Sequence, residues 1–202
     1  MTNKGTFGGW EKSIAAEYVL KEQFVSDGSG GTITFDNIPQ RFQDIRFTFA
    51  LRSNNAAVSD TVSCRINDDT AAVYSTQDLN AQATTVTAAE NIGTATPIML
   101  VIAGDTAPAG SFAIGEIKSP FYSSTMGNKQ LIGSWLTRND TASGECELYY
   151  RGLFWFPTVA GGIPREGIKK IQLSLVSGTG FVAGSVITMY GAGQLSPSRT
   201  AS

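Results

Sequence analysis

Apolar and polar residues alternate with a period of two along most of the chain. The clearest segment, residues 45–52, places on one face Ile45, Phe47, Phe49 and Leu51. Because side chains of a β-strand point to opposite faces in turn, this segment is predicted to be a half-buried strand. Burial of each of these side chains is expected to contribute about 1.5–3 kcal/mol relative to exposure.

Further short apolar or alternating segments follow, and glycine-rich or Asn/Asp-containing turns separate them. They cover residues 31–39, 61–67, 71–76, 96–104, 111–119, 129–138, 146–156, 168–176 and 185–191. The best helix candidate, residues 76–85, has only a weak apolar stripe. Residues 10–21 fit an amphipathic helix, but their second half runs into a glycine-rich turn and is interpreted as strand. About ten strands without βαβ alternation predict an antiparallel β-sandwich.

The two ends of the chain differ from its middle. Residues 1–9 and 194–202 are small, polar and aperiodic, which is typical of a flexible N-terminal arm and a C-terminal tail. Residues 10–193 are expected to form a single domain. Phe7 and Trp10 are large apolar residues at the arm, where little local structure would bury them. They either pack on their own sandwich or contact a neighbouring subunit.

Within the segment 146–156, residues 148–156 are apolar on both faces of the expected strand. One face would then lie on the core, and the other would need a second element, a terminal arm or another subunit. A carbohydrate-binding platform is the less favoured interpretation of its aromatic residues and their neighbours, which are Trp135, Tyr149, Tyr150, Phe154, Trp155 and Phe156.

Composition narrows the class of protein. The 202 residues are 42% hydrophobic, enough for a sizeable core, and only 16% charged, below the roughly 25% of typical soluble domains. A Ser/Thr/Asn-rich surface of this kind is found in β-rich extracellular and virion proteins. The net charge of −2 gives no basic field for nucleic acid or acidic lipid. Neither a membrane span nor a secretory signal is recognised, so the chain is expected to fold in a cytoplasm.

The sequence offers little catalytic chemistry. It contains no histidine, which excludes Ser-His-Asp and Cys-His catalysis and histidine-ligated metals. It has no phosphate-binding loop motif, and no cofactor or metal is expected. A turn at Asn67, Asp68 and Asp69 has oxygen ligands for calcium, but these are also ordinary turn residues. We therefore do not expect an enzyme.

Paired carboxylates are the one catalytic device that remains, and a glycosidase-like enzyme is kept as a third hypothesis. The candidates are Glu116, Asp140, Glu145 and Glu147. No spacing among them selects a pair.

Two cysteines lie far apart in the sequence. Cys64 shares strand parity with Val62 and Ile66, and Cys146 shares it with Leu148 and Tyr150. Both are predicted to be buried free thiols, with a disulfide and a reactive thiol as the alternatives.

Three stretches resemble the jelly-roll virion proteins of tailed bacteriophages, a group that includes capsid decoration (cement) proteins and tail or fibre proteins. The first, residues 10–20 leading into residues 33–53, is similar to that group's F-x-x-I-P turn followed by a strand that ends in Arg-Ser. The second, residues 64–76, resembles its strand with an Asn-Asp turn followed by a tyrosine. The third, residues 180–193, resembles its closing G-S-x-x-x-L-Y-G, with Met189 in the leucine place.

The resemblance implies a jelly-roll sandwich and a structural role in the virion. The expected function is capsid decoration: a subunit, trimeric in this hypothesis, that binds the major capsid protein on the exterior of the expanded head and stabilises it. The alternative is a tail or fibre module that contacts neighbouring tail proteins and recognises a host-surface glycan. The resemblance transfers no catalytic residue.

Overall fold

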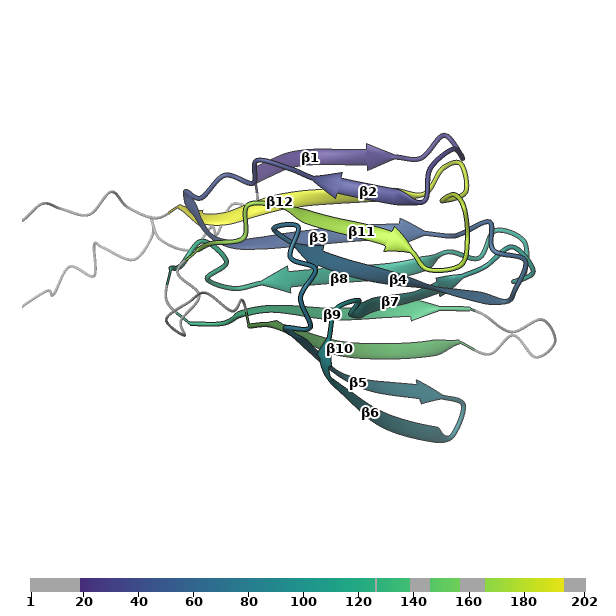
Figure 1. Cartoon of the computed structure of the whole chain (residues 1–202). Helices are drawn as coiled ribbons and strands as arrows, with labels where there is room; N and C mark the ends of the chain where they lie inside the picture. The colour runs from purple at the N-terminus through teal and green to yellow at the C-terminus, as the bar shows by residue number, and fades with distance from the viewer. Residues whose placement is uncertain (1–18, 126, 139–145, 157–165, 195–202) are drawn as a thin grey trace, which may run out of the picture.

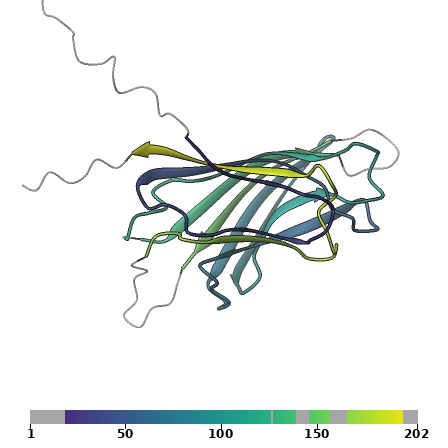
Figure 2. The ribbon, with the colours of Figure 1, turned by 90° about the horizontal axis from the view of Figure 1, so that it is seen from above.

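The computed structural model describes residues 19–125, 127–138, 146–156 and 166–194, which form twelve β-strands in two antiparallel sheets (Figure 1). No helix occurs in these residues. The two sheets face one another as the layers of a β-sandwich (Figure 2). The predicted all-β antiparallel sandwich is confirmed, with more strands than the roughly eight to ten that the turn spacing suggests.

The larger sheet has eight strands and the smaller one has four. In spatial order the larger sheet consists of β1 (Val19–Val25), β12 (Val186–Gln194), β3 (Phe42–Leu51), β8 (Ala113–Ser119), β9 (Lys129–Thr137), β10 (Glu147–Trp155), β5 (Tyr74–Gln82) and β6 (Thr85–Thr94). The smaller sheet consists of β2 (Thr32–Phe35), β11 (Ile171–Leu175), β4 (Ser59–Ile66) and β7 (Ile98–Ala103).

Strand pairing is nested along the chain. β1 pairs with β12 and β3 with β8 in the larger sheet, while β2 pairs with β11 and β4 with β7 in the smaller one. Two hairpins, β5–β6 and β9–β10, are added to the larger sheet beyond β8. As Figure 1 shows, β5 and β6 therefore extend past the area that the smaller sheet covers.

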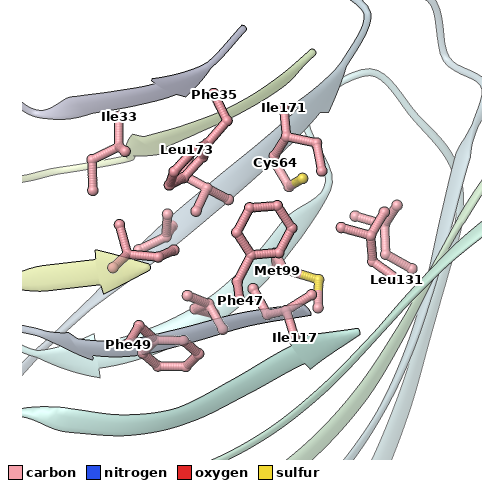
Figure 3. Packing of buried hydrophobic residues seen from close by; sticks show 14 of the residues in the cluster. Ile33, Phe35, Phe47, Phe49, Cys64, Met99, Ile117, Leu131, Ile171 and Leu173 are labelled. Carbon is pink, nitrogen blue, oxygen red and sulfur yellow. The ribbon is translucent and has the colours of Figure 1, made fainter. Parts of the chain in front are cut away.

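The core lies between the two sheets and follows the alternation of the sequence. Along β3 every second residue is buried, and the buried set includes the four apolar residues predicted from the pattern. Rings from the two sheets meet here: the centroids of Phe35 and Phe47 lie 5.1 Å apart. Figure 3 shows Met99, Ile117 and Leu131 packed in the same cluster. One contiguous cluster therefore joins both sheets.

Both segments that were considered as helices contain β-strand. Residues 76–85, the best helix candidate, are not helical: residues 76–82 continue strand β5 and Thr85 begins β6. The interpretation of the end of segment 10–21 as strand is confirmed by β1, which begins at Val19. The expected arm, residues 1–9, lies outside the described residues, and of the expected tail only Gln194 lies within them.

The two cysteines have opposite environments. Cys64 is 1% exposed in the core (Figure 3), as predicted, and burial raises the pKa of its thiol to about 12. Cys146 is exposed and precedes β10, so the prediction that it is buried is wrong. Cys146 does share the parity of Leu148 and Tyr150, but that set is exposed, and the alternate set with Tyr149 and Trp155 is buried. Both thiols are free, which excludes a disulfide between them in this structure.

This difference predicts selective thiol labelling. A thiol reagent added to the native protein near neutral pH should modify Cys146 rapidly, because its thiol is exposed to the solvent. Cys64 should react only after denaturation, since its thiol is both inaccessible and hard to ionise. Mass spectrometry of the labelled peptides measures both rates. Equal rates in the native protein would contradict the burial of Cys64.

Candidate interaction surface

The larger sheet has one face on the core and one face that no described element covers. The alternation that buries Trp135, Tyr149 and Trp155 turns their neighbours in sequence to the opposite side. On β10 these neighbours are Leu148, Tyr150 and Phe154, so the prediction that residues 148–156 are apolar on both faces is confirmed. Leu148 and Tyr150 are 51% and 55% exposed.

The strand register aligns one apolar residue from each of the eight strands in a single line across this outer face. We call this line the apolar row, and in spatial order it consists of Val25, Val186, Ala50, Ile114, Leu136, Leu148, Ala81 and Val86. Successive members are directly opposite partners, so their side chains share one face. The row is about 34 Å long, because neighbouring strands lie about 4.8 Å apart.

The apolar row is accessible along most of its length. Its larger members are Val25, Ile114, Leu136, Leu148 and Val86, and they are 47–64% exposed. The row contains no charged or polar side chain. It lies toward the end of the sheet where β1 ends and β12 begins, on the right in Figure 1. Single exposed hydrophobic residues are ordinary on a protein surface, but a contiguous line of them is typical of an interface.

The row adjacent to it is apolar on only three of the eight strands. Its polar part lies on the first five strands of the spatial order and consists of Gln23, Thr188, Thr48, Glu116 and Ser134. Tyr150, Leu79 and Ala88 continue it on β10, β5 and β6. The apolar surface is therefore one residue wide on the five strands β1, β12, β3, β8 and β9. It is wider on β10, β5 and β6.

A hollow interrupts this wider part at Gly152. The absence of a side chain on β10 leaves a volume of about 310 Å³, with walls that include Tyr150, Phe154, Ile132 and Leu79. A Cβ atom added to Gly152 would meet only Cε2 of Phe154, at 3.8 Å, so the space is open. The ring of Phe154 is stacked on that of Phe156 with centroids 6.1 Å apart. The hollow is thus aromatic and apolar, and Gln77 and Gln130 are the polar side chains at its rim.

A compact charged group lies on the other side of Tyr150. Glu116 accepts ion-pair contacts at 2.5 Å from both Arg46 and Lys118. The hydrogen bond from Lys118, together with the charge of Arg46, holds the pKa of Glu116 below its ordinary value. Glu116 on β8 belongs to the adjacent row, and Arg46 and Lys118, which are directly opposite one another on β3 and β8, lie one row beyond it. Because Glu116 is ionised and already paired, it is unsuited to act as a general acid near neutral pH.

The structure separates the carboxylates that the sequence offered as candidates. Glu116 lies on the outer face of the larger sheet, whereas Glu147 lies on the inner face, is 8% exposed and accepts a hydrogen bond from Tyr149. Side chains on opposite faces of a sheet do not flank one glycosidic bond. Asp140 and Glu145 lie outside the described residues.

The turn at residues 67–69 has a structural role. Oδ1 of Asn67 accepts the backbone N–H groups of Lys169 and Lys170, at 2.8 and 3.0 Å. Oδ2 of Asp69 accepts the indole N–H of Trp155 at 2.9 Å. These oxygens thus tie the turn to the loop before β11 and to β10. Within the described ranges, no group of three or more side chains that ligate metals occurs.

Phe7 and Trp10, the predicted partner contacts, lie outside the described residues. The apolar row was not predicted, because its members lie at positions from 25 to 186 and only the register of eight strands aligns them. No helix in the described part of the chain is long and apolar enough to span a membrane. Comparison of the chain with known protein families, characterised proteins and solved structures finds no match.

Proposed function

We propose that this chain is a structural protein of a bacteriophage particle, a capsid decoration protein that binds the exterior of the expanded head. The observation that carries this proposal is the apolar row, a contiguous hydrophobic line across all eight strands of an uncovered sheet face. Such a surface favours a macromolecular partner with a matching flat contact, not a small substrate in a cleft.

The strand pairing supports the jelly-roll part of the proposal. When the hairpins β5–β6 and β9–β10 are set aside, the first remaining strand pairs with the last, the second with the second to last, and so on to β4 with β7. An antiparallel hairpin of strands rolled into two sheets, as in a jelly roll, has this nested order. The order agrees with the resemblance of residues 33–53, 64–76 and 180–193 to phage virion proteins.

The mechanism of decoration would be thermodynamic. A subunit that binds only the expanded lattice stabilises that lattice at each site by RT ln(1 + [L]/Kd), about 2.7 kcal/mol when its free concentration is one hundred times Kd. Many sites then act together against the pressure of packaged DNA. The major capsid protein would be the partner, and the chain would be located on the exterior of the virion after folding in the host cytoplasm.

The test is the addition of purified protein to expanded heads that lack decoration. Cosedimentation measures binding, and the temperature at which DNA-filled heads release their DNA measures stabilisation. We expect saturable binding and a higher release temperature. Absence of binding, or binding without any change in the release temperature, would contradict a decoration function.

The hollow at Gly152 favours one second candidate, a tail or fibre module that recognises a host-surface glycan. Aromatic rings beside amide side chains are suited to the apolar faces and hydroxyl groups of a sugar, and Tyr150, Phe154, Gln77 and Gln130 line this hollow. Binding of the isolated protein to particular members of a glycan array, with absence from DNA-filled heads, would support this candidate over decoration.

A substitution that fills the hollow separates the two candidates. Gly152→Val should fold, because the added atoms enter open space and valine favours a strand. If a sugar occupies the hollow, this variant should lose glycan binding by about 10-fold or more, as expected when a buried contact is displaced. If the apolar row carries the function, binding to heads should be unchanged. Titration of each ligand with both proteins makes the measurement.

A further inference from the structure

Strand β6 is an open edge of the larger sheet. It pairs only with β5, and every residue from Thr85 to Gly93 is exposed. The backbone N–H and C=O groups that point away from β5, in the plane of the sheet, therefore have no strand partner among the described residues. The two most exposed large hydrophobic side chains in the described part of the chain both lie on it: Val86 is 64% exposed and Ile92 is 75% exposed.

The other three sheet edges carry the features that prevent strands from associating. β1 has Lys21 and Glu22 at its centre and a register shift between Leu20 and Glu22. β2 is four residues long, and β7 is six residues long and lies against β8, β9 and β10. β6 has ten residues without lysine, arginine or proline, and Glu90 is its one charge. Its own register shift against β5 lies near its end, after Asn91, so that its pairing is regular from Thr85 to Asn91. Long edge strands without such protection pair with other strands.

We propose that β6 pairs with β6 of a second copy of this chain, antiparallel and around a two-fold axis normal to the sheet, with Ala89 on the axis. Such an axis keeps the outer faces of both sheets on the same side. Because directly opposite residues share a face, the axis must pass through a residue and not between two residues. The possible registers are then few, and the side chains select one of them.

The register centred on Ala89 is the most complementary. On the outer face it places Val86 opposite Ile92 of the second copy, twice by symmetry, and Ala88 opposite Glu90 of the second copy. On the inner face Thr87 lies opposite Asn91. A centre at Glu90 sets two carboxylates directly opposite one another, and a centre at Ala88 sets Val86 opposite Glu90. Cross-strand like charges are destabilising, whereas β-branched pairs are stabilising.

Pairing in this register joins the two eight-stranded sheets edge to edge and extends the apolar row. The row ends at Val86, and its next member would be Ile92 of the second copy. The two exposed side chains then shield one another from water, which explains why a strand with so little core of its own carries them. This inference goes beyond the proposed function and does not depend on it, because it concerns the isolated protein alone.

Sedimentation velocity of the purified full-length protein over a range of concentrations tests the pairing. We expect a dimer for the wild type. Val86→Lys and Ile92→Lys should each weaken dimerisation by about 10-fold or more, since each places an ammonium group opposite an apolar side chain at two symmetric positions. Val86→Thr, which keeps the branched shape, is the matched control and should remain dimeric. Circular dichroism confirms that each variant is folded.

The double variant Val86→Lys/Ile92→Glu provides a rescue, because lysine then faces glutamate of the second copy at both positions. It should restore dimerisation relative to Val86→Lys alone. Cross-linking tests the register: in a Cys146→Ser background, Ala89→Cys should form an intermolecular disulfide under mild oxidation, and Thr85→Cys should not. A monomeric wild type, or an oligomer that Val86→Lys and Ile92→Lys leave intact, would overturn the proposal. A trimer held together by another surface would remain intact in both lysine variants and would therefore also overturn the proposal.

Discussion

Replacement of Arg52 with methionine should lower the free energy of unfolding by about 3 kcal/mol, because charge-assisted hydrogen bonds are each worth about 1.5–3 kcal/mol. Arg52 directly follows strand β3 in the chain and is 7% exposed. Its guanidinium donates to the backbone carbonyl oxygens of Asp105, Ala107 and Pro108 at 2.9–3.0 Å, and to that of Ser111 at 3.4 Å. Methionine fills similar volume but removes the Arg52 donors from all four carbonyl groups, of which that of Pro108 still accepts the backbone N–H of Ser111. Denaturant unfolding followed by tryptophan fluorescence measures the change.

Two further variants identify the cause of that loss. Arg52→Lys keeps the charge, but one ammonium group does not reach four carbonyl groups of the 105–111 loop, so it should recover less than half of the lost stability. Arg46→Met removes a half-exposed arginine whose ion pair is with Glu116, and it should cost at most about 1 kcal/mol. A loss below that value for Arg52→Met would contradict the role of Arg52 as the anchor of the loop between β7 and β8.

The sequence alone predicted the sandwich because a strand with one face buried between two sheets requires apolar residues at alternate positions. Every second residue of β3, β4 and β9 is buried, so the apolar positions recur with period two. The alternation holds only in part in the closing strand β12: Ile187 and Met189 are buried and Val186 and Tyr190 are not, but Thr188 between the two buried residues is buried as well. Where two sheets face one another, hydrophobic pattern and structure agree.

The β5–β6 hairpin was missed for the same physical reason. It extends beyond the smaller sheet, so neither of its faces requires a continuous apolar set, and β6 is exposed almost throughout. Its residues are small or polar, and residues 76–85 therefore gave a weak helical stripe in place of an alternating pattern. Pairing with β10, from Glu147–Gln82 to Trp155–Tyr74, specifies the strand instead. Backbone hydrogen bonds between strands do not depend on the side chains, so this pairing produces no alternation of apolar and polar residues in the sequence.

The candidate surface was predictable only in part. The density of apolar residues in segment 146–156 indicated a strand with two apolar faces, and the exposure of Leu148 and Tyr150 bears this out. The remaining members of the apolar row are single hydrophobic residues that look ordinary in their own segments. Ile114 is followed by Gly115 and Glu116, and Val25 precedes a turn. Their alignment follows from the order and register of the strands, which connect residues more than a hundred positions apart.

The double substitution Leu136→Lys/Leu148→Lys should remove partner binding while the fold remains intact. The two leucines are directly opposite one another at the middle of the apolar row and are 47% and 51% exposed. In the dissociated protein both lysines are hydrated, so the melting temperature should change by only a few degrees. In the complex two ammonium groups would lose water without gaining partners. We expect affinity for expanded heads to fall by about 100-fold or more, as for central residues of an interface.

The control is Val176→Lys, which introduces one lysine, against two in the double variant, at a residue that is 52% exposed and directly follows β11 of the other sheet. It should leave binding to heads unchanged, because it lies away from the outer face of the larger sheet. Titration of heads with the wild type and the two variants, by cosedimentation, compares the three affinities. Equal affinities would exclude the apolar row as the contact surface. If binding were lost to the same extent in the control, the effect would come from added positive charge, and the hydrophobic contact proposed for Leu136 and Leu148 would be wrong.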